Sequence, residues 1–170
     1  MDNCKPCDKT RAILKNRKTD FTEYVVTDGE AERELFEKFG GKYLPFIIHG
    51  KHSITSADKY SVISFLAESY GPDILTSREN RLLSNHFDPD GNPLVVMYGT
   101  QTCGYCTKEK AFFDSEGINY TELDIKQNKK AKRLYRELEG NGTPLTYVGY
   151  RRVNGFDKKQ LKTALSDYSI

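Results

Sequence analysis

The stretch LVVMYGTQTCGYC, residues 94–106, holds the strongest structural signal in the chain. Its start, Leu94–Tyr98, is an apolar run bounded by a proline and a glycine, which predicts a short buried strand. A helix is expected to follow from Cys103 to about Glu116, where a glycine ends it. The segment therefore predicts a strand, a short turn, and a helix whose first turn carries Cys103 and Cys106.

The rest of the second half continues as alternating strands and helices. We expect a strand at Asn119–Ile125, a helix at Lys129–Glu139, a hairpin of Leu145–Val148 and Arg151–Val153, and a closing helix from Asp157 to about Tyr168. Asp157 is of a residue type that commonly caps a helix N-terminus. The predicted order of elements is βαβαββα, which is an α/β fold.

The first half repeats this pattern 99 residues earlier. Two Cys-x-x-Cys pairs, Cys4/Cys7 and Cys103/Cys106, are related by this offset, as are Pro45 and Pro144. A fixed offset of this kind is the sequence signature of an internal repeat. The elements expected in the first half are a helix to about Lys18, a strand at Phe21–Val26, a helix at Glu30–Phe39, a hairpin at Phe46–Ile54 and a helix at Ala57–Tyr70.

The repeat predicts two tandem domains, at residues 1–71 and 93–170, joined by a linker at residues 72–92. A short helix is expected in the linker around residues 78–85, before a cluster of turn residues. At the offset of the repeat, the counterpart of the Leu94–Tyr98 strand would precede Met1. The first domain is therefore expected to lack its first strand.

Composition restricts the partners that the chain is expected to have. The 26 Lys and Arg residues are balanced by 24 Asp and Glu residues, and the two signs are interspersed, which argues against nucleic acid. No apolar run approaches the roughly 20 residues that a membrane-spanning helix needs. The N-terminus has no basic and apolar segments of a secretory signal. We therefore expect no membrane partner and a cytoplasmic location.

The cysteine pairs point to redox chemistry or to a metal. In zinc ribbons the two pairs lie about 15–20 residues apart, whereas here 95 residues separate Cys7 from Cys103, so no metal is expected. Cys103 is predicted at a helix N-terminus, where the helix dipole and free backbone amides favour the thiolate. Cys103 can then attack a disulfide, and Cys106, one turn later, can resolve the mixed disulfide.

The dipeptide Thr143-Pro144 opens a predicted strand after a glycine-rich loop, and it has two interpretations. A cis bond at Pro144 would turn the backbone of Thr143 toward a substrate, and bonds before proline tolerate the cis form. A proline at the first residue of a strand also occurs without any function.

Three segments of the second half resemble the glutaredoxin family, in the order of that family. They are MYGTQTCGYC at residues 97–106, GTP at residues 142–144 and NGFD at residues 154–157. The resemblance implies a thioredoxin-type fold, glutathione as the reductant and disulfide-containing proteins as substrates. It makes Cys103 the nucleophile and Cys106 the resolving thiol.

The resemblance also implies a glutathione groove. Its residues would be Tyr105, Thr143, Pro144, Gly155, Phe156 and Asp157. Tyr105 would line the groove, the backbone of Thr143 would pair with the cysteine of glutathione, and the last three residues would hold the γ-glutamyl end at a helix N-terminus. Many family members carry a Lys three residues before the first Cys; Thr100 replaces it here and removes a contact to a glutathione carboxylate.

The first half retains fewer of these features. Cys4, Cys7 and Pro45 are present, whereas the glycine and aromatic contacts to glutathione are not. Cys4 and Cys7 remain candidate redox residues. Our hypothesis is that this half has lost most glutathione binding and serves packing, partner selection or electron relay.

Two alternative functions remain open. Gly104, where other members have Pro, also occurs in glutaredoxins that hold an iron–sulfur cluster through the first Cys and glutathione. The replacement of Lys by Thr100 instead favours a glutathione-independent carrier that depends on thioredoxin reductase.

Overall fold

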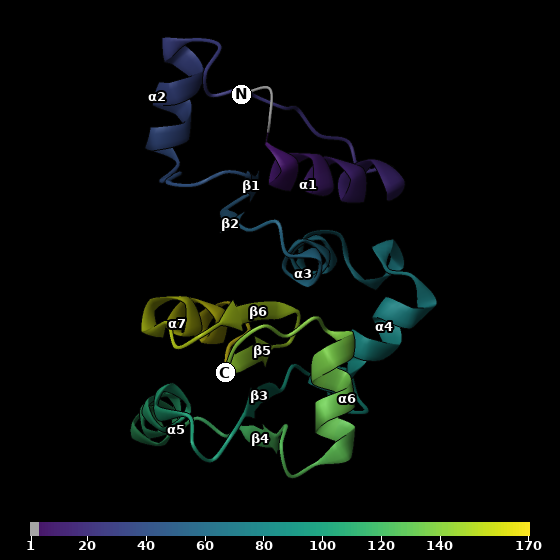
Figure 1. The fold of residues 1–170 in the computed structure, drawn as a ribbon, viewed down its shortest axis with the longest axis vertical. Coiled ribbons are helices and arrows are strands. Elements are labelled where there is room, and N and C mark those ends of the chain that lie inside the picture. The colour runs from purple at the N-terminus through teal and green to yellow at the C-terminus, as the bar shows by residue number, and fades with distance from the viewer. Residues whose placement is uncertain (1–3) are drawn as a thin grey trace. The chain divides into compact units, whose positions relative to one another are not determined.

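The computed structural model describes residues 4–170, and the chain divides into two units, Met1–Ser69 and Tyr70–Ile170 (Figure 1). The second unit contains α4 (Ser77–Leu83), β3 (Val95–Gly99), α5 (Gly104–Glu116), β4 (Thr121–Asp124), α6 (Lys129–Glu137), β5 (Leu145–Val148), β6 (Arg151–Asn154) and α7 (Lys158–Asp167). Short 3-10 helices, Pro72–Ile74 and Ser84–His86, flank α4. From β3 onward the order is βαβαββα, which confirms the predicted α/β fold of this half.

The four strands of the second unit form one sheet in the order β4-β3-β5-β6. Strand β3 lies parallel to β4 and antiparallel to β5, while β5 and β6 form the predicted antiparallel hairpin. All five residues of β3 are buried. This central position explains the uninterrupted apolar run in the sequence, because a strand covered on both faces has no polar side.

Helices cover both faces of this sheet (Figure 1). On one face Val95, Val148 and Val153 from three strands pack with Phe113 of α5 and Leu161 of α7. Because side chains alternate across a strand, the neighbouring strand residues point to the opposite face. The main core of the unit therefore lies between the sheet and helices α5 and α7.

The opposite face is closed by the stretch that precedes β3. His86 is fully buried, and its ring stacks on Tyr147 with centroids 3.9 Å apart. Its Nε2 atom lies 3.1 Å from the hydroxyl oxygen of Tyr98. Leu82 and Leu83 of α4 are buried as well. Residues 82–86 are thus part of the packing of the second unit.

The first unit contains α1 (Lys5–Asn16), α2 (Glu30–Lys38), the hairpin β1 (Phe46–His49) and β2 (His52–Thr55), and α3 (Lys59–Tyr70). The strand expected at residues 21–26 is wrong, because this segment forms no strand in the structure. In the second unit the corresponding strand, β4, pairs with β3. Within the described residues the first unit has no counterpart of β3, so the segment has no neighbour with which to form backbone hydrogen bonds.

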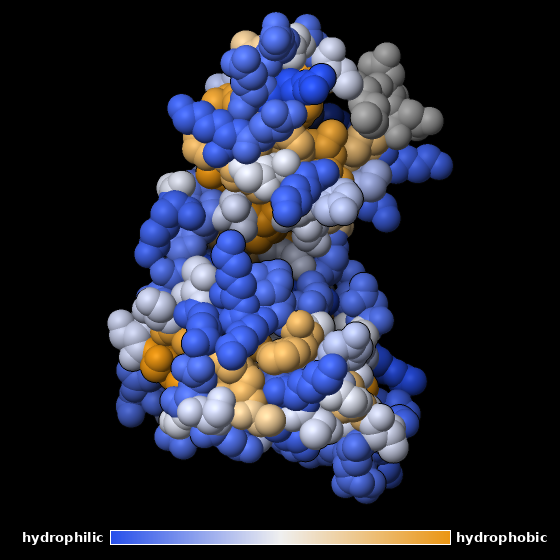
Figure 2. Space-filling view, turned by 90° about the vertical axis from the view of Figure 1, so that its left-hand side faces the viewer, coloured by the Kyte–Doolittle hydropathy of each residue, from blue (hydrophilic) through white to orange (hydrophobic). Residues whose placement is uncertain are grey.

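Several large apolar side chains consequently reach the surface of the first unit (Figure 2). Tyr24 is 59% exposed, and Phe21 and Val25 of the same segment are also exposed. In addition, no helix within residues 4–170 combines the length and the apolar character required to cross a membrane.

The buried His86 is expected to make the stability of the protein depend on pH. Burial, with a contribution from Arg152, lowers the pKa of its imidazole to about 3, against about 6.5 in an unfolded chain. Between these values the unfolded state binds more protons, so the free energy of unfolding decreases as the pH falls from about 6.5 toward 3. We expect His86→Phe to reduce the slope of the unfolding free energy against pH by about 1.4 kcal/mol per pH unit, which corresponds to about one bound proton. Urea unfolding followed by circular dichroism between about pH 4 and pH 6 measures this slope.

The control is His49→Phe, which changes an exposed histidine on β1. It should leave the pH dependence as in the wild type. A wild-type slope in the His86→Phe variant would contradict the prediction.

Candidate functional site

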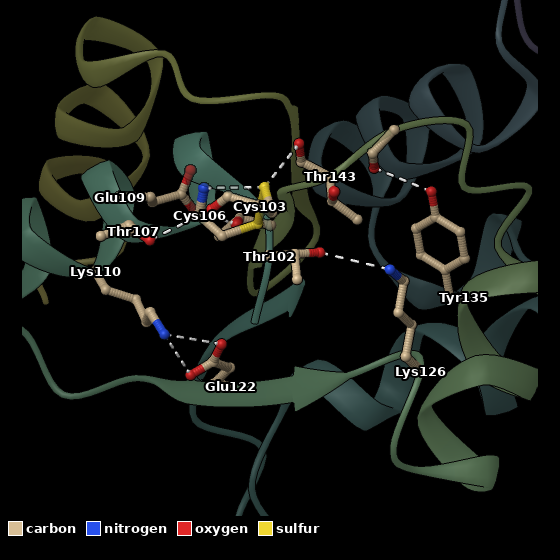
Figure 3. The surroundings of a disulfide bond; sticks show 12 residues. Thr102, Cys103, Cys106, Thr107, Glu109, Lys110, Glu122, Lys126, Tyr135 and Thr143 are labelled. Carbon is tan, nitrogen blue, oxygen red and sulfur yellow. Dashed lines mark hydrogen bonds and ion pairs between the residues drawn. A yellow bond between two sulfur atoms is a disulfide. The ribbon is translucent and has the colours of Figure 1, made fainter. Parts of the chain in front are cut away.

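A disulfide joins Cys103 and Cys106 at the start of α5, with Cα atoms 5.2 Å apart (Figure 3). Cys103 is the N-cap of this helix, and its Sγ atom accepts a hydrogen bond from the backbone amide of Cys106 at 3.1 Å. The free amides and the positive end of the helix dipole favour a negative charge at this position. Cys103 is therefore placed to form a stabilised thiolate when the disulfide is reduced.

The two cysteines differ in exposure because of the strand behind them. Cys103 is half-buried, whereas Cys106 is only 1% exposed. A Cβ atom at Gly99, the last residue of β3, would lie 3.1 Å from the Sγ atom of Cys106. The glycine therefore lets α5 approach the strand end closely, and the pair presents only Cys103 to a substrate.

The loop before β5 brings the predicted proline motif to the same place. The Thr143–Pro144 bond is cis, as one of the two interpretations of the sequence proposed. The carbonyl oxygen of Thr143 lies 3.4 Å from the Sγ atom of Cys103. The backbone amide of Gly155 donates to the carbonyl of Pro144 at 2.8 Å, so the turn before α7 is fixed to this loop.

The other predicted groove residues lie around this centre in different roles. Tyr105 is 61% exposed, and Lys108 Nζ lies 5.2 Å from its ring centroid. Phe156 packs at the edge of the main core, 6.2 Å from the ring of Phe112. Asp157 is the N-cap of α7 and accepts from the backbone amide of Gln160 at 2.9 Å. The contacts of these residues to glutathione stay predictions.

A lysine from another loop approaches the site from the side of β4. Lys126 follows β4, and its Nζ atom lies 3.5 Å from the hydroxyl oxygen of Thr102, next to Cys103 (Figure 3). Thr100, at the position where a lysine is common in the family, is buried. A positive charge thus lies beside Thr102, the residue before Cys103, although the sequence lacks one at residue 100. In the sequence, Lys126 begins a run rich in lysines, which is a signal that could have indicated this charge.

Arg152 of β6 anchors the chain that leads from α6 to Thr143. It is 7% exposed, and its guanidinium donates to the carbonyl oxygen of Leu138 at 2.7 Å and of Glu139 at 3.4 Å. It also donates to the hydroxyl oxygen of Tyr147 at 3.1 Å. These bonds satisfy carbonyl groups that the end of a helix leaves without partners.

Glu109 is a buried carboxyl group behind the disulfide, and no motif in the sequence marks it. It is fully buried, and Thr146 of β5 donates a hydrogen bond to its Oε1 atom. Burial raises the pKa of Glu109 to about 7, although the bond from Thr146 acts in the opposite direction. A carboxyl group with a pKa near neutrality, one helical turn from Cys106, can both accept and release protons.

The first unit holds a second disulfide with the same local geometry. Cys4 and Cys7 are joined with Cα atoms 5.2 Å apart, and the amide of Cys7 donates to the Sγ atom of Cys4 at 3.2 Å. The Leu44–Pro45 bond is cis as well. Cys7 is half-buried rather than buried, since no strand in the described part of this unit lies where β3 lies behind Cys106. Among residues 4–170, no three or more His, Cys, Asp or Glu side chains gather as in a metal site.

The disulfide lies at the start of a helix, next to a loop with a cis proline, and the central strand of the β4-β3-β5-β6 sheet lies behind it. This is the arrangement of the thioredoxin fold. The second unit therefore places the chain among the thiol–disulfide oxidoreductases.

Comparison with known proteins narrows this class. A family model described as glutaredoxin matches residues 95–153. Glutaredoxin 3 of Escherichia coli K12 is 30% identical over 64 residues, which cover 37% of this chain and 77% of that protein. An uncharacterised glutaredoxin-like 8.6 kDa protein of the rubredoxin operon of Clostridium pasteurianum is 25% identical over 69 residues, 40% of this chain and 92% of its own length. The chain belongs to the glutaredoxin family.

Among solved structures, a glutaredoxin from Archaeoglobus fulgidus is similar to this chain. It is 25% identical, covers 42% of this chain and 84% of its own, and has a TM-score of 0.38.

We expect Arg152→Met to destabilise the second unit and to loosen the loop that carries Thr143. The change removes the donor to the carbonyl group of the buried Leu138, which should lower the free energy of unfolding by about 1–3 kcal/mol. Urea unfolding measures the loss, and hydrogen exchange of residues 139–143 should become faster. Arg136→Met, an exposed position on α6, is the control and should change the stability by less than about 0.5 kcal/mol. Equal stability of the two variants would refute the anchoring role.

Proposed function

We propose that the chain is a glutathione-linked dithiol oxidoreductase that reduces disulfides of proteins and of glutathione mixed disulfides through Cys103 and Cys106. The observation that carries the proposal is the position of Cys103 Sγ, at the N-terminus of α5 and 3.4 Å from the carbonyl oxygen of Thr143. An extended thiol peptide can pair with the backbone at Thr143 and bring its sulfur to Cys103. Glutathione fits this description, and the expected setting is the reducing cytoplasm.

The reaction proceeds by thiol–disulfide exchange. The thiolate of Cys103 attacks a substrate disulfide, a bond forms between Cys103 and one substrate sulfur, and the other substrate sulfur leaves as a thiolate. Cys106 then attacks the Sγ atom of Cys103, which releases the second substrate thiolate and closes the disulfide of Figure 3. Two glutathione molecules reopen this disulfide, supply two electrons and two protons, and leave as glutathione disulfide.

Three features around Cys103 support binding of an anionic tripeptide. Lys126 supplies a positive charge beside Thr102. The N-terminus of α7 is a favourable position for a carboxylate, because of its backbone amides and the helix dipole. Tyr105 offers an exposed ring at the entrance. Together these features support a proposed groove that contacts both ends of glutathione, in which Lys126 compensates for the lysine that is replaced by Thr100.

The same proposal includes a tandem duplication. The bounds of β1, β2 and α2 precede those of β5, β6 and α6 by 99 residues, and α1 and α5 start at the same offset. The two cis prolines, Pro45 and Pro144, share it. The first unit retains the disulfide but not the strand that buries the resolving cysteine. We infer that it is a modified copy that assists the second unit.

The first test is a glutathione-coupled disulfide reduction assay. We expect Cys103→Ser to reduce the activity of the full chain to the uncatalysed rate, because the change removes the sulfur that lies 3.4 Å from the carbonyl oxygen of Thr143. Cys4→Ser should leave most of the activity. If neither variant loses activity, the glutathione-linked function is wrong, and a cluster-binding or thioredoxin-reductase-dependent function takes its place.

A second prediction concerns Lys126. If its ammonium group binds a carboxylate of glutathione, Lys126→Ala should raise the KM for glutathione by about two- to fivefold, because this factor corresponds to the loss of an exposed ion pair. The effect should shrink at high salt. Lys129→Ala, at the start of α6, is the matched control and should leave the KM unchanged. An unchanged KM in Lys126→Ala would remove this residue from the groove.

A further inference from the structure

We propose that Glu109 accepts the proton of Cys106 when this thiol resolves a mixed disulfide, and returns it when the disulfide is reduced. The inference rests on the proposed dithiol mechanism and assigns a role to a residue outside the groove. Glu109 acts through Cys106 and makes no contact with the substrate.

The need for such a group follows from the burial of Cys106. With 1% of its surface exposed, its thiol has no direct access to solvent water that would take up a proton. Burial in apolar surroundings also disfavours a thiolate. The resolving step nevertheless requires the thiolate, since the thiol is a poor nucleophile. A proton acceptor inside the protein removes this obstacle.

Glu109 lies at the required place. It follows Cys106 by three residues on α5, and residues at this spacing lie on one helix face with Cβ atoms about 5–6 Å apart. Figure 3 shows its side chain beside the disulfide, on the side away from Thr143. This placement allows a direct hydrogen bond from the reduced Cys106 thiol, or a transfer through one water.

One oxygen of the carboxyl group is available for this transfer. Thr146 occupies Oε1, whereas Oε2 is buried and has no hydrogen-bond partner among the described residues. A buried polar atom without a partner costs about 1–3 kcal/mol, so its retention needs a reason. In the reduced protein the thiol of Cys106 supplies a donor on the same helix face.

Among the described residues, the lysines on the helices around Glu109 do not form ion pairs with its carboxyl group. Met97 and Gly99 of β3 and Thr146 of β5 are uncharged. The charged groups on the helices around it are engaged elsewhere: Lys110 with Glu122, Lys162 with Glu116, and Lys158 over the ring of Phe112. Desolvation raises the pKa of Glu109 to about 7, a value suited to proton exchange near neutral pH.

The proton balance is as follows in the resolving step. The carboxylate of Glu109 takes the proton of the Cys106 thiol, the Cys106 thiolate attacks Cys103 Sγ, and the substrate sulfur leaves as a thiolate that is protonated by solvent. In the reverse direction an external thiolate attacks Cys103, the bond to Cys106 breaks, and Glu109 protonates the departing Cys106 thiolate.

The test is the reduction of the Cys103–Cys106 disulfide by dithiothreitol, followed by stopped flow in the full chain with Cys4→Ser and Cys7→Ser. After correction for the thiolate fraction of dithiothreitol, the wild-type rate constant should fall by about tenfold per pH unit above about pH 7. Glu109→Gln should be slower by about a hundredfold below pH 7 and should lose this pH dependence. Glu116→Gln, an exposed carboxyl on the same helix, is the control and should behave as the wild type.

A wild-type pH profile in a folded Glu109→Gln protein would overturn the inference. If this variant does not fold, the carboxyl carbon of Glu109 is instead titrated by NMR in the protein that retains Glu109, in its oxidised and reduced forms. Proton sharing with Cys106 should shift the pKa by about one unit between the two forms, and equal values overturn the inference. Neither measurement uses glutathione, so loss of the glutathione-linked function alone would leave these outcomes unaffected.

Discussion

Pairing of the central strand β3 on both of its edges is the constraint on which the second unit depends. It joins β4 and β5, which otherwise belong to separate helix–strand segments, into one sheet. The last residue of β3, Gly99, packs against Cys106. The alternating side chains of β3 contribute to the packing on both faces of the sheet. The first unit illustrates the constraint by contrast. There the hairpin β1-β2 forms, but residues 21–26 stay irregular and Cys7 stays half-buried.

Local sequence signals were sufficient for most of the second unit. The apolar run at Leu94–Tyr98 and the glycine after α5 predicted the strand and the helix, and the motif at Cys103 predicted the disulfide centre. The segment at residues 21–26 has the alternation of a strand and is not one. A strand requires a partner that the alternation of its own side chains does not provide. For this reason the alternating pattern at residues 21–26 was not sufficient to predict a strand.

The parts of the site that the sequence did not predict are polar groups whose roles come from packing. Glu109 lies between Lys108 and Lys110 in the sequence, a setting typical of a solvent-exposed helix face. Its spacing from Cys106, Phe112 and Phe113 nevertheless places it on the buried face of α5. This spacing was the feature of the sequence from which the burial of Glu109 could have been predicted. Arg152 and His86 carried no such signal, because their partners, Leu138 and Tyr147, come from other elements.

The stacking of His86 on Tyr147 bears on where the redox domain begins. A fragment cut at residue 93, where the β-sheet starts, would retain every residue of the disulfide centre but would uncover the aromatic face of Tyr98 and Tyr147. Such a fragment would expose apolar surface that the intact chain covers with α4 and His86. The smallest fragment that keeps this face covered therefore has to start before Ser77, about a dozen and a half residues ahead of the first strand of the sheet.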